Sequence, residues 1–319
     1  MDKINKMSLI LCIILILLVG CGNDNNEIVS YSKEDIPVDS PHLSIVIDDP
    51  LLDLGPKEFE KAYEELPDNY IINIKHGGEF GGLIEELSYE ELSDGKITKK
   101  DAEKVKAFAP FYSGYPPSAI SLQGLRFFRN LENIGLEYAS VTNIAELKYL
   151  NKLNHISFIS CNLVMDNPDK DLIFISNLQD PNRFGKFMIE LSDVDLDDIK
   201  FLEGMSNLSD YYIDLSNNKI KDISPLLNLE EIYELELDDN DINDVSPLVN
   251  LKTATRISLA NNPITDISAL RNIDILEEER VADDPLGINI DGINISYNEV
   301  KEMFGEKSKY IYRAQTSWR

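Results

Sequence analysis

The strongest constraint on the fold of this chain is a phrase that returns at a fixed interval. The segment LSNNKIKDISPLLNL (215–229) recurs as LDDNDINDVSPLVNL (237–251) and as LANNPITDISALRNI (259–273), each copy starting 22 residues after the one before. A constant period of this length is typical of a solenoid, because a single unit cannot bury its own apolar side and must pack on its neighbours. The sequence therefore predicts a stack of similar turns.

Each copy contains the pattern of a short strand followed by a tight bend. Leu235 and Leu237 alternate with Glu234, Glu236 and Asp238, which is the period of two of a strand with one buried face. The asparagine that follows has an amide able to satisfy backbone groups that no neighbouring strand reaches. One face of each strand is thus predicted to be apolar and the other acidic.

A short helical turn is predicted after each bend, with Ser224 and Ser246 as N-caps and Pro225 and Pro247 at the first helical position. The full motif, L-x-L-x-x-N-x-I-x-D-I-S-P-L-x-x-L, resembles the internalin-like leucine-rich repeats of bacteria. The resemblance implies an α/β solenoid with a parallel sheet on its concave side, short helical turns on its convex side, and a cap at each end.

The repeat pattern extends over residues 118–286 and is regular over 213–276. Ile134 precedes Ile156 by 22 residues, whereas Phe158 and Leu191 are 33 apart, which predicts an insertion near 164–186. The stretch ADDPL (282–286) is interpreted as a degenerate last unit. The repeat position of the asparagine holds Cys161 in one early unit, and a buried thiol that acts as a small hydrophobe is favoured there over a reactive one.

The N-terminus predicts export and lipid attachment. Two lysines precede eleven apolar residues, Leu9 to Val19, a run too short to span a bilayer and typical of a secretory signal over 1–20. The sequence LVGC resembles the bacterial lipobox, which implies cleavage before Cys21, a lipid on its thiol and a lipoprotein anchored to the bacterial membrane outside the cytoplasm. An ordinary signal with a chance cysteine is the alternative. The polar residues 21–42 are predicted to be a flexible tether.

Residues 43–117 are predicted to form a small α/β unit with a cap helix. LSIVIDD and YIINIKH have the pattern of strands, and GPKEFEKAYEELPDN that of a helix. Asp94, Gly95 and Asp101 match the second half of a calcium loop, but the first half fails to match. Thr98 and Asp101 are instead expected to form a capping box at the start of a helix.

Residues 287–319 are predicted to form a C-terminal cap made of a hairpin and a helix. INIDGINIS places an Asp-Gly turn between alternating apolar residues, which is typical of a hairpin. SYNEVKEMFG has the pattern of a helix, and the end of the chain, 301–319, carries five Lys or Arg against two Glu.

Neither catalysis nor a cofactor is predicted. The chain has three histidines, His42, His76 and His155, none next to an acid and a nucleophile at a catalytic spacing, and HGGEFGG (76–82) does not match a phosphate-binding loop. From Ile189 to Leu276 there are 19 Asp or Glu against 6 Lys or Arg. This excess of negative charge disfavours nucleic acid and anionic lipid as partners and favours cationic partners. No metal site is predicted, because the acidic segments do not match a calcium template.

The alternation and the period together predict rows of side chains on the concave face. One row is expected to contain His155, Tyr212, Glu234 and Arg256, and the next Glu190, Asp214 and Glu236. Asp214, Glu236 and Asp238 are expected to lie close together without an internal partner, since neighbouring parallel strands are about 4.8 Å apart. The predicted ligand-binding residues are Tyr138, His155, Glu190, Tyr212, Asp214, Glu234, Glu236, Asp238 and Arg256.

Two functions fit these features. The first is a lipid-anchored binding module of the cell surface that holds a protein or peptide, expected to be cationic, on the acidic concave face. The second is an envelope-organising lipoprotein that acts as a rigid spacer. The mixture of acids with tyrosine and histidine on one face favours the first, because amphipathic aromatic residues suit a contact surface better than a spacer.

Overall fold

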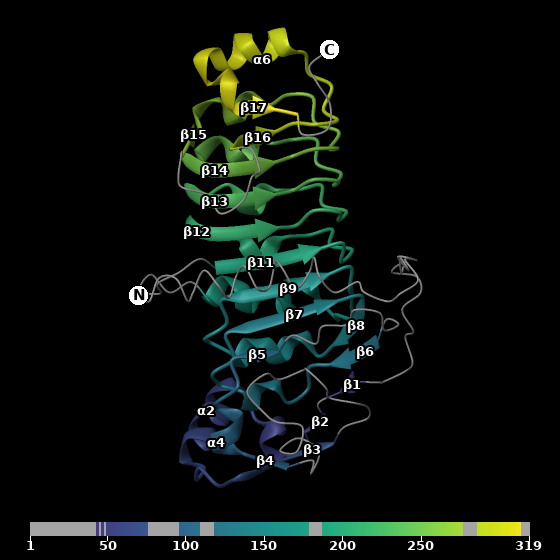
Figure 1. The fold of residues 1–319 in the computed structure, drawn as a ribbon, viewed down its shortest axis with the longest axis vertical. Coiled ribbons are helices and arrows are strands. Elements are labelled where there is room, and N and C mark those ends of the chain that lie inside the picture. The colour runs from purple at the N-terminus through teal and green to yellow at the C-terminus, as the bar shows by residue number, and fades with distance from the viewer. Residues whose placement is uncertain are drawn as a thin grey trace, which may run out of the picture.

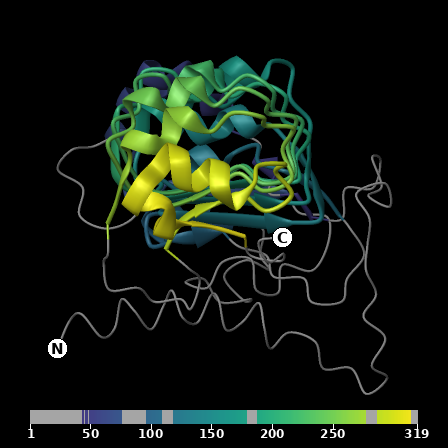
Figure 2. The ribbon, with the colours of Figure 1, turned by 90° about the horizontal axis from the view of Figure 1, so that it is seen from above.

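The protein is an elongated stack of parallel strands backed by short helical turns (Figure 1). The computed structural model describes residues 43–44, 46–47, 49–75, 96–108, 118–178, 187–276 and 286–313. The predicted α/β leucine-rich-repeat solenoid is confirmed. Seen from above, the strands lie along one side of the stack and the helical turns along the opposite side (Figure 2).

The main sheet is parallel, and its strands follow the chain from one end of the stack to the other. In spatial order its path is β5 (Ala107–Phe108), β7 (Asn133–Glu137), β9 (His155–Ile159), β11 (Phe187–Ser192), β12 (Asn207–Asp214), β13 (Glu231–Glu236), β14 (Thr253–Ser258), β16 (Gly287–Asn289) and β17 (Ile311–Tyr312). A short strand, β15 (Asp274–Ile275), also pairs with β14.

The register of this sheet follows the spacings in the sequence. Ile134 pairs with Ile156, and Tyr212 pairs with Glu234, both 22 residues apart. Across the irregular unit, β9 still pairs directly with β11, since Leu191 lies opposite Phe158. The extra residues of that unit therefore leave the strands in step, and part of them forms α5 (Pro168–Asp171).

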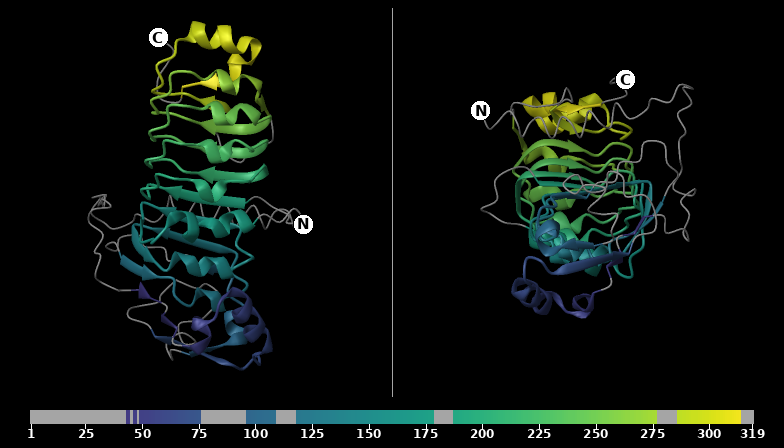
Figure 3. Two further views of the ribbon diagram at one scale, coloured as in Figure 1. Left: turned by 180° about the vertical axis from the view of Figure 1, so that it is seen from behind. Right: turned by 60° about the horizontal axis from the view of Figure 1, so that its bottom comes forward.

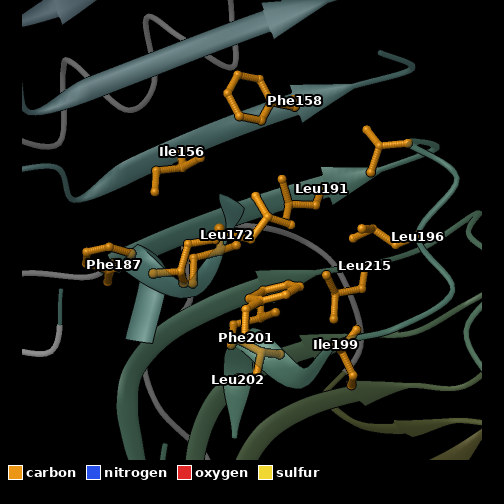
Figure 4. Packing of buried hydrophobic residues seen from close by; sticks show 14 of the residues in the cluster. Ile156, Phe158, Leu172, Phe187, Leu191, Leu196, Ile199, Phe201, Leu202 and Leu215 are labelled. Atoms are coloured by element: carbon orange, nitrogen blue, oxygen red, sulfur yellow. The ribbon is translucent and has the colours of Figure 1, made fainter. Parts of the chain in front are cut away.

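From β5 to β14, each repeat places a 3-10 turn after its strand, on the far side of the stack (Figure 3, left). These turns are η3 (Leu125–Phe127), η4 (Ile144–Tyr149), η5 (Ile173–Leu178), η6 (Lys200–Leu202), η7 (Ser224–Leu226), η8 (Ser246–Asn250) and η9 (Ser268–Asn272). Apolar side chains from strands and turns fill the space between the two sides. In the middle of the stack, Leu191 and Leu215 of neighbouring units lie beside Phe201 of η6 (Figure 4), and all three are at most 1 % exposed.

The serines do not act as N-caps, contrary to the sequence prediction. η7 begins at Ser224 itself, and its proline is second in the turn. The carboxylate of Asp222 accepts a hydrogen bond from the Ser224 N–H at 2.8 Å, and Asp244 does the same for Ser246. The aspartate of the DISP motif performs the capping because its short side chain reaches the amide two residues ahead.

Buried asparagines connect consecutive units. The Asn240 side chain accepts a hydrogen bond from the Ile220 N–H at 3.0 Å, and donates to the carbonyls of Leu215 at 3.0 Å and Leu237 at 3.1 Å. Asn218 and Asn262 make equivalent contacts. We call Asn218, Asn240 and Asn262 the asparagine ladder. It satisfies backbone groups of the bend that lie outside the strand ladder and are cut off from water.

Cys161 occupies the ladder position of an earlier unit. It is fully buried, and its thiol lies 3.4 Å from the Leu136 carbonyl. Asn240 and Asn262 reach the carbonyl of the same relative residue, 25 positions back. The structural role predicted for this cysteine is therefore confirmed, with the thiol as a weak donor in place of an amide.

The N-terminal unit packs against the first repeats and shares strands with them. It contains β2 (Val46–Ile47), β3 (Ile71–Lys75) and β4 (Lys96–Thr98) in an antiparallel sheet, with η2 (Pro50–Asp53), α2 (Pro56–Glu65) and α4 (Lys99–Ala102). The predicted capping box of Thr98 and Asp101 is present. The cap helix is shorter than expected, because the chain after Ala102 turns and enters the main sheet as β5.

A second parallel sheet lies beside the first repeats. Its strands are β1 (Leu43–Ser44), β6 (Ser118–Ser121), β8 (Ala139–Thr142) and β10 (Asn162–Leu163). A buried ion pair of Arg126 with Glu146 fixes the N-terminal unit to the repeats, because the same guanidinium donates to the Leu52 carbonyl at 2.9 Å.

The C-terminal hairpin prediction is wrong. β16 pairs in parallel with β14 and β17, so INIDG continues the main sheet as one more repeat strand. The residue opposite Arg256 is Gly287, 31 residues later, where the next strand begins. The last strand therefore does not follow the 22-residue period by which 282–286 was interpreted as the last unit. The predicted helix is present as α6 (Tyr297–Phe304), with a capping box of Ser296 and Glu299, and is followed by η10 (Gly305–Tyr310).

Several sequence predictions fall outside the described residues. They concern the signal sequence, Cys21, the tether, the HGGEFGG segment, the calcium template up to and including Asp94 and Gly95, and all of ADDPL except Leu286. In the ranges that the structure covers, no helix has the length and apolar character needed to cross a bilayer.

We expect Asn240→Ala to lower the free energy of unfolding by about 2 kcal/mol, because it leaves the buried Ile220 N–H without an acceptor and removes one of the two amide donors of each of the Leu215 and Leu237 carbonyls. Asn250→Ala is the control: its side chain is exposed and makes one hydrogen bond, to the Leu227 carbonyl at 2.9 Å. That change should cost about 0.5 kcal/mol or less. Urea unfolding measures both, and equal losses would contradict the ladder.

Candidate binding surface

The predicted rows of side chains exist on the outer face of the main sheet, which we call the sheet face. Strand pairing aligns Asn133, His155, Met188, Tyr212, Glu234 and Arg256 in one row. It aligns Gly135, Ser157, Glu190, Asp214, Glu236 and Ser258 in the next. Seven of the nine predicted binding residues therefore lie in two adjacent rows.

The other two predicted residues lie where strands end. Asp238 follows β13 and accepts a hydrogen bond from the Ala260 N–H at 2.7 Å. Tyr138 follows β7 and is 41 % exposed. It has a φ of 51°, in a column of left-handed corner residues that continues with Ser160, Asp193, Asn217, Asp239, Asn261 and Gly292.

Tyr138 and Tyr212 do not form one aromatic site. Three strand steps, from β7 through β9 and β11 to β12, separate them, which is roughly 14 Å. A left-handed backbone conformation costs a residue with a Cβ, such as tyrosine, about 1 to 2 kcal/mol. A large exposed tyrosine at that corner is thus held against its own backbone preference.

The expectation that Glu236 has no internal partner is wrong. The Arg256 guanidinium, one strand further along, forms an ion pair with the Glu236 carboxylate, and its Nε donates to the Tyr312 hydroxyl at 3.2 Å. Glu236 is 5 % exposed and Glu234 is 9 % exposed. These two carboxylates therefore lie much deeper in the face than strand alternation alone implies.

Asp214 and Glu190 lack such an arginine. Asp214 accepts a hydrogen bond from the Ser216 N–H at 2.8 Å, and no Lys or Arg of the described residues forms an ion pair with it. Glu190 lies 3.5 Å from the His155 Nε2 atom. Arg256 lies on the next strand, opposite the residue two positions before Glu236. The residue in the same relative place is Glu234 for Asp214 and Tyr212 for Glu190.

Burial raises the pKa of several groups on this face. It raises the pKa of Asp214, with the nearby Glu190 and Asp238 adding to the effect and the Ser216 hydrogen bonds opposing it. Burial also raises the pKa of Asp238 and of Glu236, and at Glu236 the Arg256 charge opposes the rise. The pKa of the Tyr212 phenol is raised by burial and by Asp214, so this hydroxyl remains a hydrogen-bond donor at neutral pH.

Sequence reasoning missed three features of the main sheet. Tyr312 reaches the sheet face from β17, although residue 312 was expected in a separate cap. On the buried side of the sheet, the ring of Phe187 stacks on that of Tyr211 with centroids 4.8 Å apart. The two extra residues of one unit form a bulge in β12, because the register to β13 shifts between Leu208 and Tyr212. The 24-residue spacing from Ile189 to Ile213 was the only signal of that bulge.

The described residues contain no group of three or more His, Cys, Asp or Glu side chains placed to hold a metal ion. Of the calcium template, Asp101 is described, and its carboxylate accepts hydrogen bonds from Thr98 and Lys104. That carboxylate therefore serves the capping box.

Comparison with known proteins identifies structural neighbours. No protein-family model matches the chain, and no curated protein matches it. An internalin C2 of Listeria monocytogenes is 26 % identical, with a TM-score of 0.42, over 63 % of this chain and 78 % of that chain. An internalin F of the same species is 17 % identical (TM-score 0.29) over 72 % of this chain and 87 % of that chain.

A leucine-rich-repeat protein of Leptospira interrogans is 17 % identical, with a TM-score of 0.42, over 61 % of this chain and 54 % of that chain. The structural neighbours are thus internalin-like leucine-rich-repeat proteins. The fold of this chain itself is assigned from its strand register and its asparagine ladder.

Asp214→Asn should make stability less dependent on pH. Because the pKa of Asp214 is raised in the folded protein, the folded state holds this proton more tightly than the unfolded chain, and the contribution of Asp214 to stability falls as pH rises above about 4. We therefore expect the variant to be more stable than wild type at pH 8, by less than about 2 kcal/mol, and equal to it near pH 3.

The control is Asp210→Asn, which removes an exposed carboxylate from the same strand. Urea unfolding at a series of pH values measures the difference from wild type for each variant. A difference for Asp214→Asn that did not change with pH, or that matched the one for Asp210→Asn, would contradict the burial of this charge.

Proposed function

We propose that this protein is an exported, lipid-anchored binding module that holds a cationic protein or peptide segment on its sheet face. The observation that carries the proposal is the contact of Arg256 with Glu236. It is an example, within the chain, of how this face binds a cation: a carboxylate of one strand meets a guanidinium that lies over the next strand. At Asp214 and at Glu190, the corresponding position on the next strand is occupied by Glu234 and Tyr212, so this chain places no lysine or arginine there.

A partner with lysine or arginine side chains would complete this pattern. Its cations would lie over Asp214 and Glu190, one strand spacing of about 4.8 Å apart. Tyr212 lies in the adjacent row, on the same strand as Asp214, and presents a hydroxyl and a ring to the same ligand. Aromatic residues of this kind are the usual anchors of protein interfaces. The strained Tyr138 supports a second contact at the edge of the face.

Charge neutralisation tests this assignment. In Asp214→Asn with Glu190→Gln, each side chain keeps its shape and its hydrogen-bond acceptor but loses its charge. We expect association with a lysine-rich peptide to slow about threefold or more, because surface charge acts mainly on the encounter rate. The wild-type rate should also fall with salt, since the Debye length shrinks from about 10 Å at 0.1 M to about 3 Å at 1 M.

Surface plasmon resonance gives both rates. The matched control is Asp197→Asn with Glu203→Gln, which removes the same charge from exposed positions away from the two rows. Arg256→Gln should act in the opposite direction and speed association, because it removes a positive charge from the sheet face. Equal slowing by the test and control pairs would assign the effect to net charge alone. No binding by the wild-type chain would favour the rigid-spacer function.

The membrane anchor rests on the LVGC sequence at Leu18–Cys21. Cys21→Ser removes the thiol that would carry the lipid, so we expect the variant to partition into the aqueous phase of a detergent extraction, while wild type enters the detergent phase. Cys161→Ser is the control, because this thiol is buried in the repeats. Unchanged partitioning of the Cys21 variant would contradict lipid attachment.

A further inference from the structure

A pocket outside the two rows of the sheet face lies where the N-terminal unit meets the first repeats. Its volume is about 320 Å³, within the range of small-molecule sites. α2 supplies Glu60, Tyr63 and Glu64, and α4 supplies Lys99. Arg129 and Lys152 come from turns that precede the strands of two consecutive repeats. Figure 1 shows α2 and α4 together at this end of the stack.

Lys99 is the buried charge of this pocket. The residue is 7 % exposed, and its ammonium lies 4.9 Å above the centre of the Tyr63 ring. It donates one hydrogen bond, to the Leu66 carbonyl at 3.0 Å, and is 3.9 Å from the Glu103 carboxylate. An ammonium group has three donors, and a buried donor without an acceptor is unfavourable. Because Lys99 lines the pocket, an acceptor that enters the pocket would supply partners for the remaining N–H groups.

The wall of the pocket carries balanced charge, with three cations and three carboxylates. Arg129 is paired with Glu60 at 2.6 Å. Lys152 donates to the Asn130 side-chain oxygen at 2.5 Å, and within the described ranges neither Lys152 nor the exposed Glu64 is in an ion pair. A purely anionic ligand would be repelled by the carboxylates, and a purely cationic one by Lys99 and Lys152. A ligand with one charge of each sign avoids both penalties.

We propose that this junction pocket binds a small zwitterion of the α-amino-acid class. The carboxylate of the ligand accepts hydrogen bonds from Lys99, with Lys152 nearby, and its ammonium group lies against Glu64. This site is independent of the function proposed for the sheet face. Because α2 and the repeats both supply its walls, the bound ligand holds the N-terminal unit on the solenoid, and occupancy raises the unfolding temperature of the chain.

Titration of the full chain with matched small molecules tests the proposal. The probes are L-alanine and D-alanine, propionate, which lacks the ammonium group, and ethylamine, which lacks the carboxylate. Calorimetry and thermal unfolding should show binding of at least one alanine enantiomer at millimolar concentration or below. Propionate and ethylamine should bind at least about tenfold more weakly, because each leaves one charge of the pocket without its partner.

Lys99→Met keeps the aliphatic stem over the Tyr63 ring and removes the charge. We expect it to weaken alanine binding at least about tenfold. Lys148→Met is the control, since the Lys148 ammonium lies 5.3 Å from the Tyr149 ring, outside the pocket. Lys152→Met should also weaken binding, which provides a second variant if Lys99→Met lowers stability.

Three results would overturn the proposal. The first is that neither alanine enantiomer binds at up to about 10 mM, a concentration tenfold above a millimolar Kd. The second is equal binding of alanine, propionate and ethylamine. The third is binding that survives both Lys99→Met and Lys152→Met. Neither result bears on the lysine-rich peptide, which binds at the sheet face.

Discussion

The structure depends on the need to satisfy the backbone at the bend after every strand. In a stack of parallel strands, the N–H and C=O groups of each strand find partners in the next, but the bend leaves that ladder while remaining buried. The asparagine ladder answers this need, since the Asn240 amide bridges the Ile220 N–H and the Leu215 carbonyl of the unit before it. Each unit is therefore completed by the next one, in hydrogen bonds as well as in apolar contacts.

This dependence explains where the chain tolerates irregularity. An unpaired bend would break the stack, so extra residues are placed where they leave the bends, and the strand register next to the bends, unchanged. The long unit between β9 and β11 places residues in α5, and the two extra residues of β12 form a bulge at the beginning of the strand. Both β12 and its neighbours still align their side chains in rows. A sheet face with regularly spaced rows is thus a consequence of the repeat, and its chemistry is set by which residues fill the outward positions.

Much of the fold was predictable because periodicity is a local signal that repeats. The spacing of 33 between Phe158 and Leu191 gave the correct strand pairing, and the alternation of Leu235 with Glu234 and Glu236 gave the correct rows. The membership of the sheet-face rows was predictable for the same reason. What the rows do chemically was less predictable, because the pairing of Arg256 with Glu236 and Tyr312 joins residues from three strands.

The C-terminal error shows the limit of local signals. An Asp-Gly pair between apolar residues is typical of a hairpin, but a glycine is also required where a neighbour occupies the space of a side chain. Gly292 has a φ of 71°, and a Cβ there would lie 2.3 Å from the Asn261 side-chain oxygen of the adjacent unit. Sequence alone does not distinguish these reasons, since the second depends on a residue 31 positions earlier.

Hydrogen exchange of single backbone amides tests the central claim most directly. The N–H groups of Ile220 and Ile242 donate to the side chains of Asn240 and Asn262, whereas those of Leu215 and Leu237 donate to backbone carbonyls of the next unit. If the asparagine ladder holds the stack together, the Ile220 and Ile242 amides should exchange as slowly as the Leu215 and Leu237 amides, through the same opening of the stack. Fast exchange at Ile220 and Ile242, with Leu215 and Leu237 still protected, would contradict the account.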